Sequence, residues 1–148
     1  MIKLKGIKTF LAVSVLTMFL STSAWGKLCN KTQLGEIKTI TAESQYITFD
    51  RAIHILCGDK TGGGHFYPGY KGKTAFPQNW TIRDILASIE MVVANTTTQD
   101  WYGPQSNGNY YTVWEKYRGD QDDQEKTAIT LKVVIRKNCM VVTAYPQK

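Results

Sequence analysis

Residues 54–77 form the segment HILCGDKTGGGHFYPGYKGKTAFP, which contains the only two histidines of the chain, His54 and His65. Three consecutive glycines directly precede the second histidine, and Lys71 and Lys73 follow it. Histidine is the side chain whose ordinary pKa places its change of charge near neutral pH. Chemistry that requires proton transfer at neutral pH is therefore expected in this segment.

Two helices are expected to flank the segment. An amphipathic pattern runs over Phe49–Leu56 directly after Thr48, which is a typical N-cap residue. Gly58 is a natural stop for this short helix. A longer helix is expected from its N-cap Thr81 to about Ala94, with one apolar stripe along it. The stripe consists of Ile82, Ile85, Leu86, Ile89 and Val93.

The parts of the chain between and before these helices have weaker patterns. Residues 61–64 are expected to form a loop, because glycines lose much conformational entropy inside a regular element. A strand is expected to begin at His65–Tyr67, and Pro77 favours an extended chain over residues 74–79. Glu36–Thr41 is short and half-apolar, which favours a strand or a tether.

From Tyr110 the period of the pattern changes to two, which is typical of β-strands. Strands are expected over Tyr110–Tyr117, Ala128–Arg136 and Cys139–Tyr145. An acidic turn at Gly119–Glu125 and a two-residue hairpin turn at Lys137–Asn138 are expected to connect them. N-terminal helices followed by an antiparallel sheet predict a single domain of the α+β class.

The first 26 residues have the pattern of a secretory signal peptide. Lysines at positions 3, 5 and 8 precede an apolar run over Phe10–Leu20, and Ala24-Trp25-Gly26 provides small residues at a cleavage position. The run is too short for a membrane anchor, since a spanning helix requires about 20 residues. We expect a signal peptide at 1–26, a mature domain at 27–148 and a secreted or periplasmic location. No stable membrane association is expected after cleavage.

The mature domain is mildly basic and contains three cysteines. Three of the 18 basic residues lie in the signal peptide, and with 12 acidic residues the remaining formal charge is about +3. This charge is compatible with an RNA substrate. In an oxidising compartment one disulfide is expected among Cys29, Cys57 and Cys139, and the sequence leaves the three pairings open. No cysteine and histidine spacing fits a zinc site.

Two histidines and a lysine are sufficient in principle to cleave RNA without a metal ion. A neutral imidazole can remove the 2′-hydroxyl proton, a protonated one can donate to the departing 5′-oxygen, and an ammonium group can stabilise the phosphorane. A glycine run lets backbone N–H groups approach a phosphate. The residues also fit plainer roles: a helix-capping His54, a surface His65 and glycines that only turn the chain.

The residues of these motifs resemble those of the bacterial EndoU endoribonucleases. That family is related to the coronavirus uridylate-specific endoribonuclease, and its domains are often carried by interbacterial toxins. The resemblance rests on three stretches: HILxGDxTGGGH at 54–65, GKTxFPxxW at 72–80 and TAYP at 143–146. It covers His54 to Pro146. The resemblance implies an EndoU/RNase A-like catalytic domain of the α+β class.

The resemblance also implies catalytic residues. His54 and His65 match the catalytic histidine pair, and the residues leave open which is the base and which the acid. Lys73 matches the catalytic lysine, whereas its neighbour Lys71 falls outside the matched motif. Lys132 is interpreted as a charge on the surface of a strand.

Four further residues are implied in substrate binding. Thr143 and Tyr145 match the pair that recognises the nucleoside, through a hydroxyl hydrogen bond to a pyrimidine edge and a stacked ring. Alternation along a strand places both on one face, as a shared pocket requires. Gly63 and Gly64 are the glycines expected to approach the phosphate.

The implied function is a secreted endoribonuclease that cleaves single-stranded RNA or tRNA loops to 2′,3′-cyclic phosphate and 5′-hydroxyl ends. Such an enzyme could serve as an antibacterial toxin or effector with a cognate immunity protein. Eukaryotic relatives use manganese, but no carboxylate cluster is evident here, so no cofactor is expected to be obligatory. The alternatives are a catalytically silent RNA- or protein-binding module on the same fold, and a small disulfide-linked interaction domain.

Overall fold

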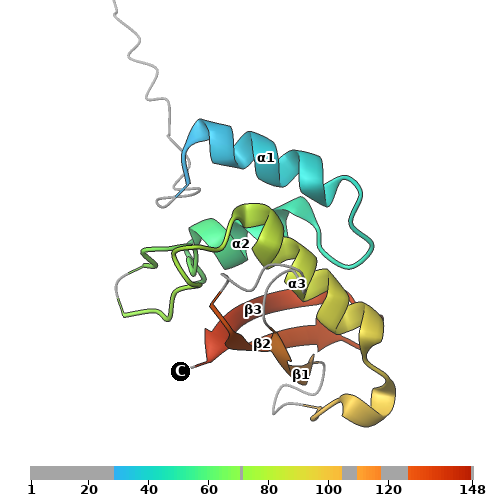
Figure 1. The fold of residues 1–148 in the computed structure, drawn as a ribbon. Helices are drawn as coiled ribbons and strands as arrows, with labels where there is room; N and C mark the ends of the chain where they lie inside the picture. The colour runs from blue at the N-terminus through green and yellow to red at the C-terminus, as the bar shows by residue number, and fades with distance from the viewer. Residues whose placement is uncertain (1–28, 71, 105–109, 118–126, 148) are drawn as a thin grey trace, which may run out of the picture.

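The computed structural model describes residues 29–70, 72–104, 110–117 and 127–147. Its elements are α1 (Lys31–Thr41), α2 (Phe49–Cys57), α3 (Ile82–Asn95), the short 3-10 helix η1 (Thr98–Asp100), β1 (Tyr110–Tyr117), β2 (Ile129–Arg136) and β3 (Val141–Gln147). The strands form one antiparallel sheet in the order β1-β2-β3. The predicted α+β class, with helices first and an antiparallel sheet after them, is confirmed (Figure 1).

Three of the predictions fall on residues that the structure does not describe. These are the signal peptide at 1–26, the acidic turn at Gly119–Glu125 and the competing lysine Lys71. Of the helices that are described, none combines the length and the apolar character that a bilayer span requires.

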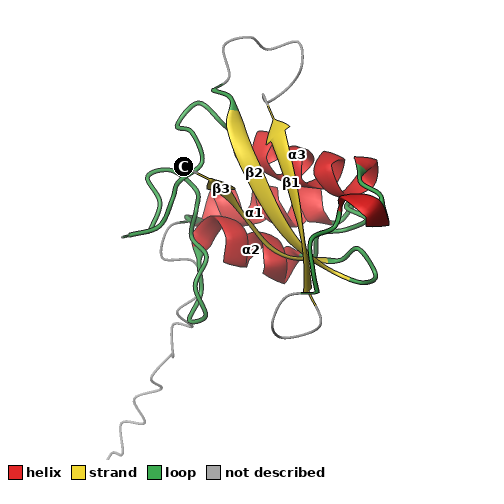
Figure 2. Cartoon of the chain, turned by 90° about the horizontal axis from the view of Figure 1, so that it is seen from below, coloured by secondary structure: helices red, strands yellow, loops and turns green. Residues whose placement is uncertain are grey.

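The helices are stacked on one side of the sheet. Helices α2 and α3 pack against the strands, and α1 lies over these two helices on the side away from the sheet (Figures 1 and 2). The predicted apolar stripe of α3 is buried, as are Leu131, Val133 and Ile135 on one face of β2. The N-terminus of α3 is closed by the predicted cap, since Thr81 Oγ1 accepts from Asp84 N at 3.1 Å and Asp84 Oδ2 accepts from Thr81 N at 2.6 Å.

The prediction of a strand or tether at Glu36–Thr41 is wrong, because these residues belong to helix α1. The helix is nucleated by a reciprocal cap: Asn30 Oδ1 accepts from Gln33 N at 3.0 Å, and Gln33 Oε1 accepts from Asn30 N at 2.8 Å. Such a capping box satisfies two of the N–H groups that every helix start leaves unpaired. Ile37 of α1 is fully buried, and Leu34 and Ile40 are partly buried against the core beside it.

Helix α2 begins and ends as predicted, but its surroundings differ from the prediction. Thr48 precedes it without a side-chain cap bond, and Gly58 stops it with a φ of 78°. The strand expected to begin at His65–Tyr67 is wrong. Residues 64–66 instead run along the C-terminal end of α2 and donate their N–H groups to its last carbonyls.

The connection between β2 and β3 is one residue longer than the predicted Lys137–Asn138 turn. Cys139 N donates to Arg136 O at 2.9 Å, and Arg136 N donates to Met140 O at 2.9 Å. Cys139 therefore belongs to the turn and adopts a left-handed conformation with a φ of 66°. This is the usual geometry of a three-residue hairpin loop, and strand β3 begins at Val141 rather than at Cys139.

Strand β3 also contains a bulge. Its pairing with β2 shifts by one residue between Val134 and Ile135, which leaves Val142 as an extra residue in β3. The shift reverses the side to which the following side chains point, because alternate residues of a strand face opposite sides. Thr143 and Tyr145 consequently lie on the half-exposed side of the strand. The buried residues of β3 are Val141, Ala144 and Pro146.

One of the three cysteine pairings left open by the sequence is formed. Cys29 and Cys57 make a disulfide across 28 residues, and Cys139 is a free, half-buried thiol. The bond joins the residue that precedes α1 to the last residue of α2. It therefore links the outermost helix to the helix end that carries His54.

Replacing both Cys29 and Cys57 by serine should lower the free energy of unfolding of the mature domain by about 3–4 kcal/mol, because the cross-link removes entropy from the unfolded chain. Urea denaturation monitored by circular dichroism measures this change. Cys139→Ser is the matched control and should shift it by less than about 1 kcal/mol. Equal losses in the two variants, or three titratable thiols in the unreduced protein, would contradict the pairing.

Candidate active site

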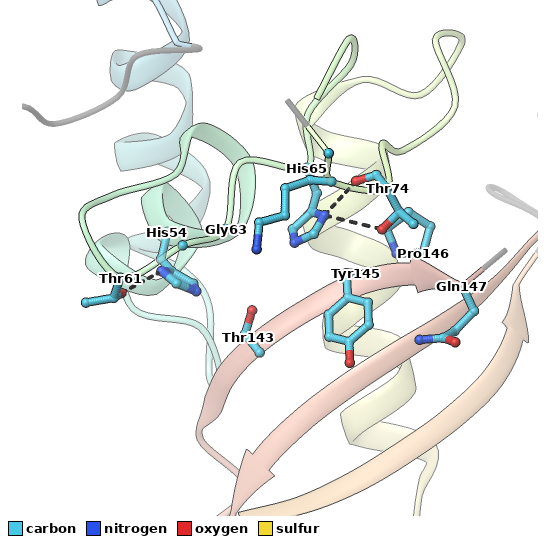
Figure 3. A pocket seen from close by; sticks show the side chains of 12 residues that line it. His54, Thr61, Gly63, His65, Thr74, Thr143, Tyr145, Pro146 and Gln147 are labelled. Carbon is cyan, nitrogen blue, oxygen red and sulfur yellow. Dashed lines mark hydrogen bonds between the residues drawn. The ribbon is translucent and has the colours of Figure 1, made fainter. Parts of the chain in front are cut away.

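A cavity of about 590 Å³ lies between the chain that connects α2 to α3 and the end of strand β3 (Figure 3). Six of the seven predicted site residues line it, although they come from three separate parts of the sequence. They are His54, Gly63, His65, Lys73, Thr143 and Tyr145. The structure thus brings together the residues that the motif comparison selected.

His54 lies in the last turn of α2 and is oriented by a carboxylate. Its Nδ1 lies 3.0 Å from Asp59 Oδ2 and 3.4 Å from Thr61 Oγ1. Burial alone would raise the pKa of Asp59, but hydrogen bonds from the side chain and backbone of Thr61 and the contact with His54 lower it to about 2. An ionised carboxylate only accepts hydrogen bonds, so Nδ1 is the donor in this pair. Nε2 is consequently the nitrogen of His54 that can exchange a proton with a substrate.

His65 is buried, with 7% of its surface exposed, so the surface role considered for it is wrong. Its Nδ1 lies 2.6 Å from Thr74 O. A carbonyl oxygen cannot donate, so Nδ1 carries the hydrogen and Nε2 is again the basic nitrogen. Burial lowers the pKa of His65, and the charges of Lys73 and of a protonated His54 lower it further, against the opposing effect of the Thr74 hydrogen bond. This imidazole is therefore held in its neutral form at neutral pH.

Lys73 lies in the exposed chain that leads to α3, and its backbone N donates to Tyr70 O at 2.8 Å. The side chain of Lys73 reaches the glycine segment, because a Cβ atom built on Gly62 would lie 3.8 Å from Lys73 Nζ. The ammonium group is thus beside the part of the cavity wall that Gly62 and Gly63 form, and its charge contributes to the lowered pKa of His65.

Thr143 and Tyr145 lie on the same side of β3 and face the histidine loop (Figure 3). The rings of Tyr145 and His65 are stacked, with centroids 5.6 Å apart and an angle of 23° between their planes. Lys132 Nζ lies 5.5 Å from the centroid of the Tyr145 ring. Lys132 is thus a half-buried charge on strand β2, as predicted, and it lies next to the Tyr145 ring.

The two glycines predicted to approach a phosphate have different roles. Gly63 lines the cavity, but the N–H of Gly64 donates to His54 O at 3.0 Å and Gly64 does not line the cavity. A Cβ on Gly63 would lie 1.7 Å from His54 O, so no other residue fits there without movement. Glycine is needed at this position chiefly because two backbone segments pack closely, in addition to its φ of 75°.

Among the residues of the site that the sequence did not select, three show different reasons for the omission. Asp59 lies inside the matched motif, in the Gly-Asp pair after α2, but its role depends on a contact with His54 that only the fold reveals. The carbonyl of Thr74 has no side-chain signal at all, and Gln147 lies beyond the last matched motif. The alternation of β3 could have indicated Gln147, since it follows Thr143 and Tyr145 at the same spacing.

The walls of the cavity include two imidazoles and one ammonium group. Among the side chains that the structure describes, no group of three or more histidine, cysteine, aspartate or glutamate residues is close enough to hold an ion.

The chain matches no protein-family model, and neither a curated protein nor a solved structure shows significant similarity to it. No known relative therefore tests the resemblance to the EndoU endoribonucleases, and this resemblance stays a prediction from the three sequence motifs.

Replacing Gly63 by alanine should lower the free energy of unfolding by about 1–3 kcal/mol more than the matched substitution Gly72→Ala, since both variants bear backbone strain and only Gly63→Ala adds the cost of overpacking. Both glycines have a positive φ, but a Cβ on Gly72 meets no atom within 4 Å. Chemical denaturation of both variants measures the difference. Equal stability of the two variants would contradict the close approach of residue 63 to α2.

Proposed function

We propose that the protein is an endoribonuclease of the EndoU type, which cleaves single-stranded RNA or tRNA loops by transphosphorylation. One observation carries the proposal. Two imidazoles, each with its Nδ1 fixed by a separate acceptor, share one cavity with a lysine ammonium group and a threonine–tyrosine pair. A nucleoside stacked on the tyrosine would have its ribose and phosphate near the basic nitrogens.

His65 is the proposed general base. Its lowered pKa favours the neutral imidazole, and the Thr74 carbonyl keeps the proton on Nδ1, so Nε2 is free to accept. Its ring stacks with Tyr145, which is proposed to hold the nucleoside. The 2′-hydroxyl of that nucleoside would therefore lie on the His65 side of the cavity.

His54 is the proposed general acid. The carboxylate of Asp59 bonds to Nδ1 and stabilises a positive charge on the ring, in the way that a buried aspartate supports an imidazolium in other acid–base pairs. His54 thus has a carboxylate partner, whereas the Nδ1 of the buried His65 is bonded to a neutral carbonyl. This difference in surroundings is the reason for proposing His54 as the acid and His65 as the base.

The proposed transphosphorylation needs no reactant other than the RNA and the side chains of the site. His65 Nε2 takes the 2′-hydroxyl proton, the 2′-oxygen forms a bond to phosphorus, the bond from phosphorus to the 5′-oxygen breaks, and His54 Nε2 gives its proton to that oxygen. Lys73 stabilises the additional negative charge on the phosphorane. The products are a 2′,3′-cyclic phosphate and a 5′-hydroxyl, and neither a metal ion nor another cofactor is required.

The proposed location is secreted or periplasmic. The signal-peptide pattern of residues 1–26 supports it, and disulfides such as Cys29–Cys57 persist mainly in oxidising compartments. RNA is scarce outside cells, so an exported ribonuclease is best understood as a toxin or effector that acts on the RNA of another cell. A cognate immunity protein would then protect the producer before export.

The mature protein, residues 27–148, should cleave a uridine-containing RNA oligonucleotide in the presence of EDTA and leave 2′,3′-cyclic phosphate ends. His65→Ala should reduce the rate by about 10²–10⁴-fold, because it removes the proton acceptor. Lys73→Ala should lose about 10²–10³-fold through lost charge stabilisation. Lys137→Ala, an exposed lysine in the β2–β3 turn, is the charge-matched control and should keep full activity.

The ends of the fragments are identified by mass spectrometry. Binding of the oligonucleotide without cleavage would support the silent binding module instead. The absence of any interaction with RNA would instead favour the alternative that the protein is a small disulfide-linked interaction domain.

The rate of cleavage should depend on pH as a bell, with its acidic limb below the ordinary histidine value of about 6.5, because the pKa of His65 is lowered. Asp59→Asn should leave this acidic limb in place, as it belongs to His65, and should lower the rate at every pH, because Nδ1 of His54 loses the acceptor that orients its ring. Profiles of kcat/KM from pH 4 to 9 test this. An acidic limb above about 6.5 in the wild type, or full activity of Asp59→Asn, would contradict these roles.

A further inference from the structure

A second cavity, of about 490 Å³, adjoins the candidate site. The two cavities share one wall, formed by Thr61, Gly62, Gly63 and Lys73. The second cavity is also lined by Lys60 and Tyr70, neither of which lines the first cavity. Each of these two side chains is exposed, and 47% of the surface of Tyr70 is accessible.

We propose that this second cavity binds the nucleotide on the leaving-group side of the cleaved bond, with its base stacked on Tyr70 and its next phosphate near Lys60. The inference rests on the proposed ribonuclease function and extends it from one nucleoside to two. It predicts that the enzyme recognises a dinucleotide step in RNA, rather than an isolated uridine.

The position of the general acid gives the direction of the RNA. The leaving 5′-oxygen must lie next to His54, and Asp59, which bonds to His54, also lines the second cavity. The nucleoside on the other side of the phosphate belongs near Tyr145, where His65 is stacked. A chain that passes from Tyr145 over Gly62 and Gly63 therefore enters the second cavity on its leaving-group side.

Tyr70 is held in place by backbone hydrogen bonds. Its N donates to Gly64 O at 2.8 Å, and its O accepts from Lys73 N at 2.8 Å. The backbone of Tyr70 is therefore tied to Gly64 in the glycine segment and to Lys73, which lines both cavities. A half-exposed aromatic ring in a cavity that two lysines also line has the composition of a stacking platform for single-stranded RNA.

The test compares two substrates that differ only on the leaving side: the dinucleotide UpA and uridine 3′-methylphosphate. Tyr70→Ala should reduce kcat/KM for UpA by about 5- to 150-fold, the loss expected for one stacked base. The same variant should leave cleavage of uridine 3′-methylphosphate unchanged. Tyr70→Phe keeps the ring and should behave as the wild type. Tyr102→Ala removes an exposed tyrosine that lines neither cavity and is the matched control.

Equal losses of Tyr70→Ala on both substrates would show that Tyr70 only supports the loop, and would overturn the proposal. The Lys60 contact is tested with UpAp, which has a phosphate after the second nucleoside. Lys60→Gln should weaken kcat/KM for UpAp and not for UpA, and the difference should disappear at high salt. An equal effect on the two would remove Lys60 from the site.

A binding measurement separates failure of the second site from failure of the proposed function. The 2′-deoxy analogue of UpA cannot be cleaved, and its affinity is measured by calorimetry for the wild type, Tyr70→Ala and Tyr70→Phe. Affinity that falls with Tyr70→Ala and not with Tyr70→Phe supports the second site even if no RNA is cleaved. Affinity that is the same for the deoxy dinucleotide and for deoxyuridine 3′-methylphosphate would overturn it, whether or not RNA is cleaved.

Discussion

The arrangement of the site depends on three backbone hydrogen bonds at the end of helix α2. The N–H groups of Gly64, His65 and Phe66 donate to the carbonyls of His54, Ile55 and Leu56, over distances of 3.0, 2.8 and 3.1 Å. The last carbonyls of a helix have no partner inside the helix, and leaving them buried and unpaired would cost free energy. The segment that satisfies them also carries the second histidine. The distance between the two imidazoles is therefore set by main-chain geometry, and Gly63 is the residue that permits the close approach.

The other half of the site is positioned by the register of an edge strand. The bulge at Val142 changes the side to which the later residues of β3 point, so that Tyr145 meets the ring of His65 instead of the core. Two local features, a capped helix end and one extra residue in a strand, thus place groups that are about 80 residues apart in the chain in one cavity. Neither feature involves the side chains of the two histidines or of Lys73.

The sequence predicts the elements with strong periodicity and fails where the structure depends on distant contacts. Helices α2 and α3 and strand β2 follow from their apolar patterns, because burial of one face dominates their formation. Helix α1 was missed since its apolar pattern is weak, although its Asn30 and Gln33 capping box is a local signal. The bulge at Val142 has no signal in a run of β-branched residues, because only the pairing with β2 defines it. The motifs identified the histidines, but Asp59 and the carbonyl of Thr74 became part of the site only through the fold.

Strand β3 is at the edge of the sheet, and its outer side is protected against the addition of a strand from another molecule. Val141 N is already bonded to Tyr46 O at 2.9 Å, the bulge interrupts the regular spacing after it, and Pro146 has no N–H to offer. Each of these features is a known means by which natural sheets avoid pairing edge to edge. The edge that lies beside the candidate site is therefore a poor template for aggregation, so the strand that carries Thr143 and Tyr145 can keep one side open to the cavity without offering its backbone to a second molecule.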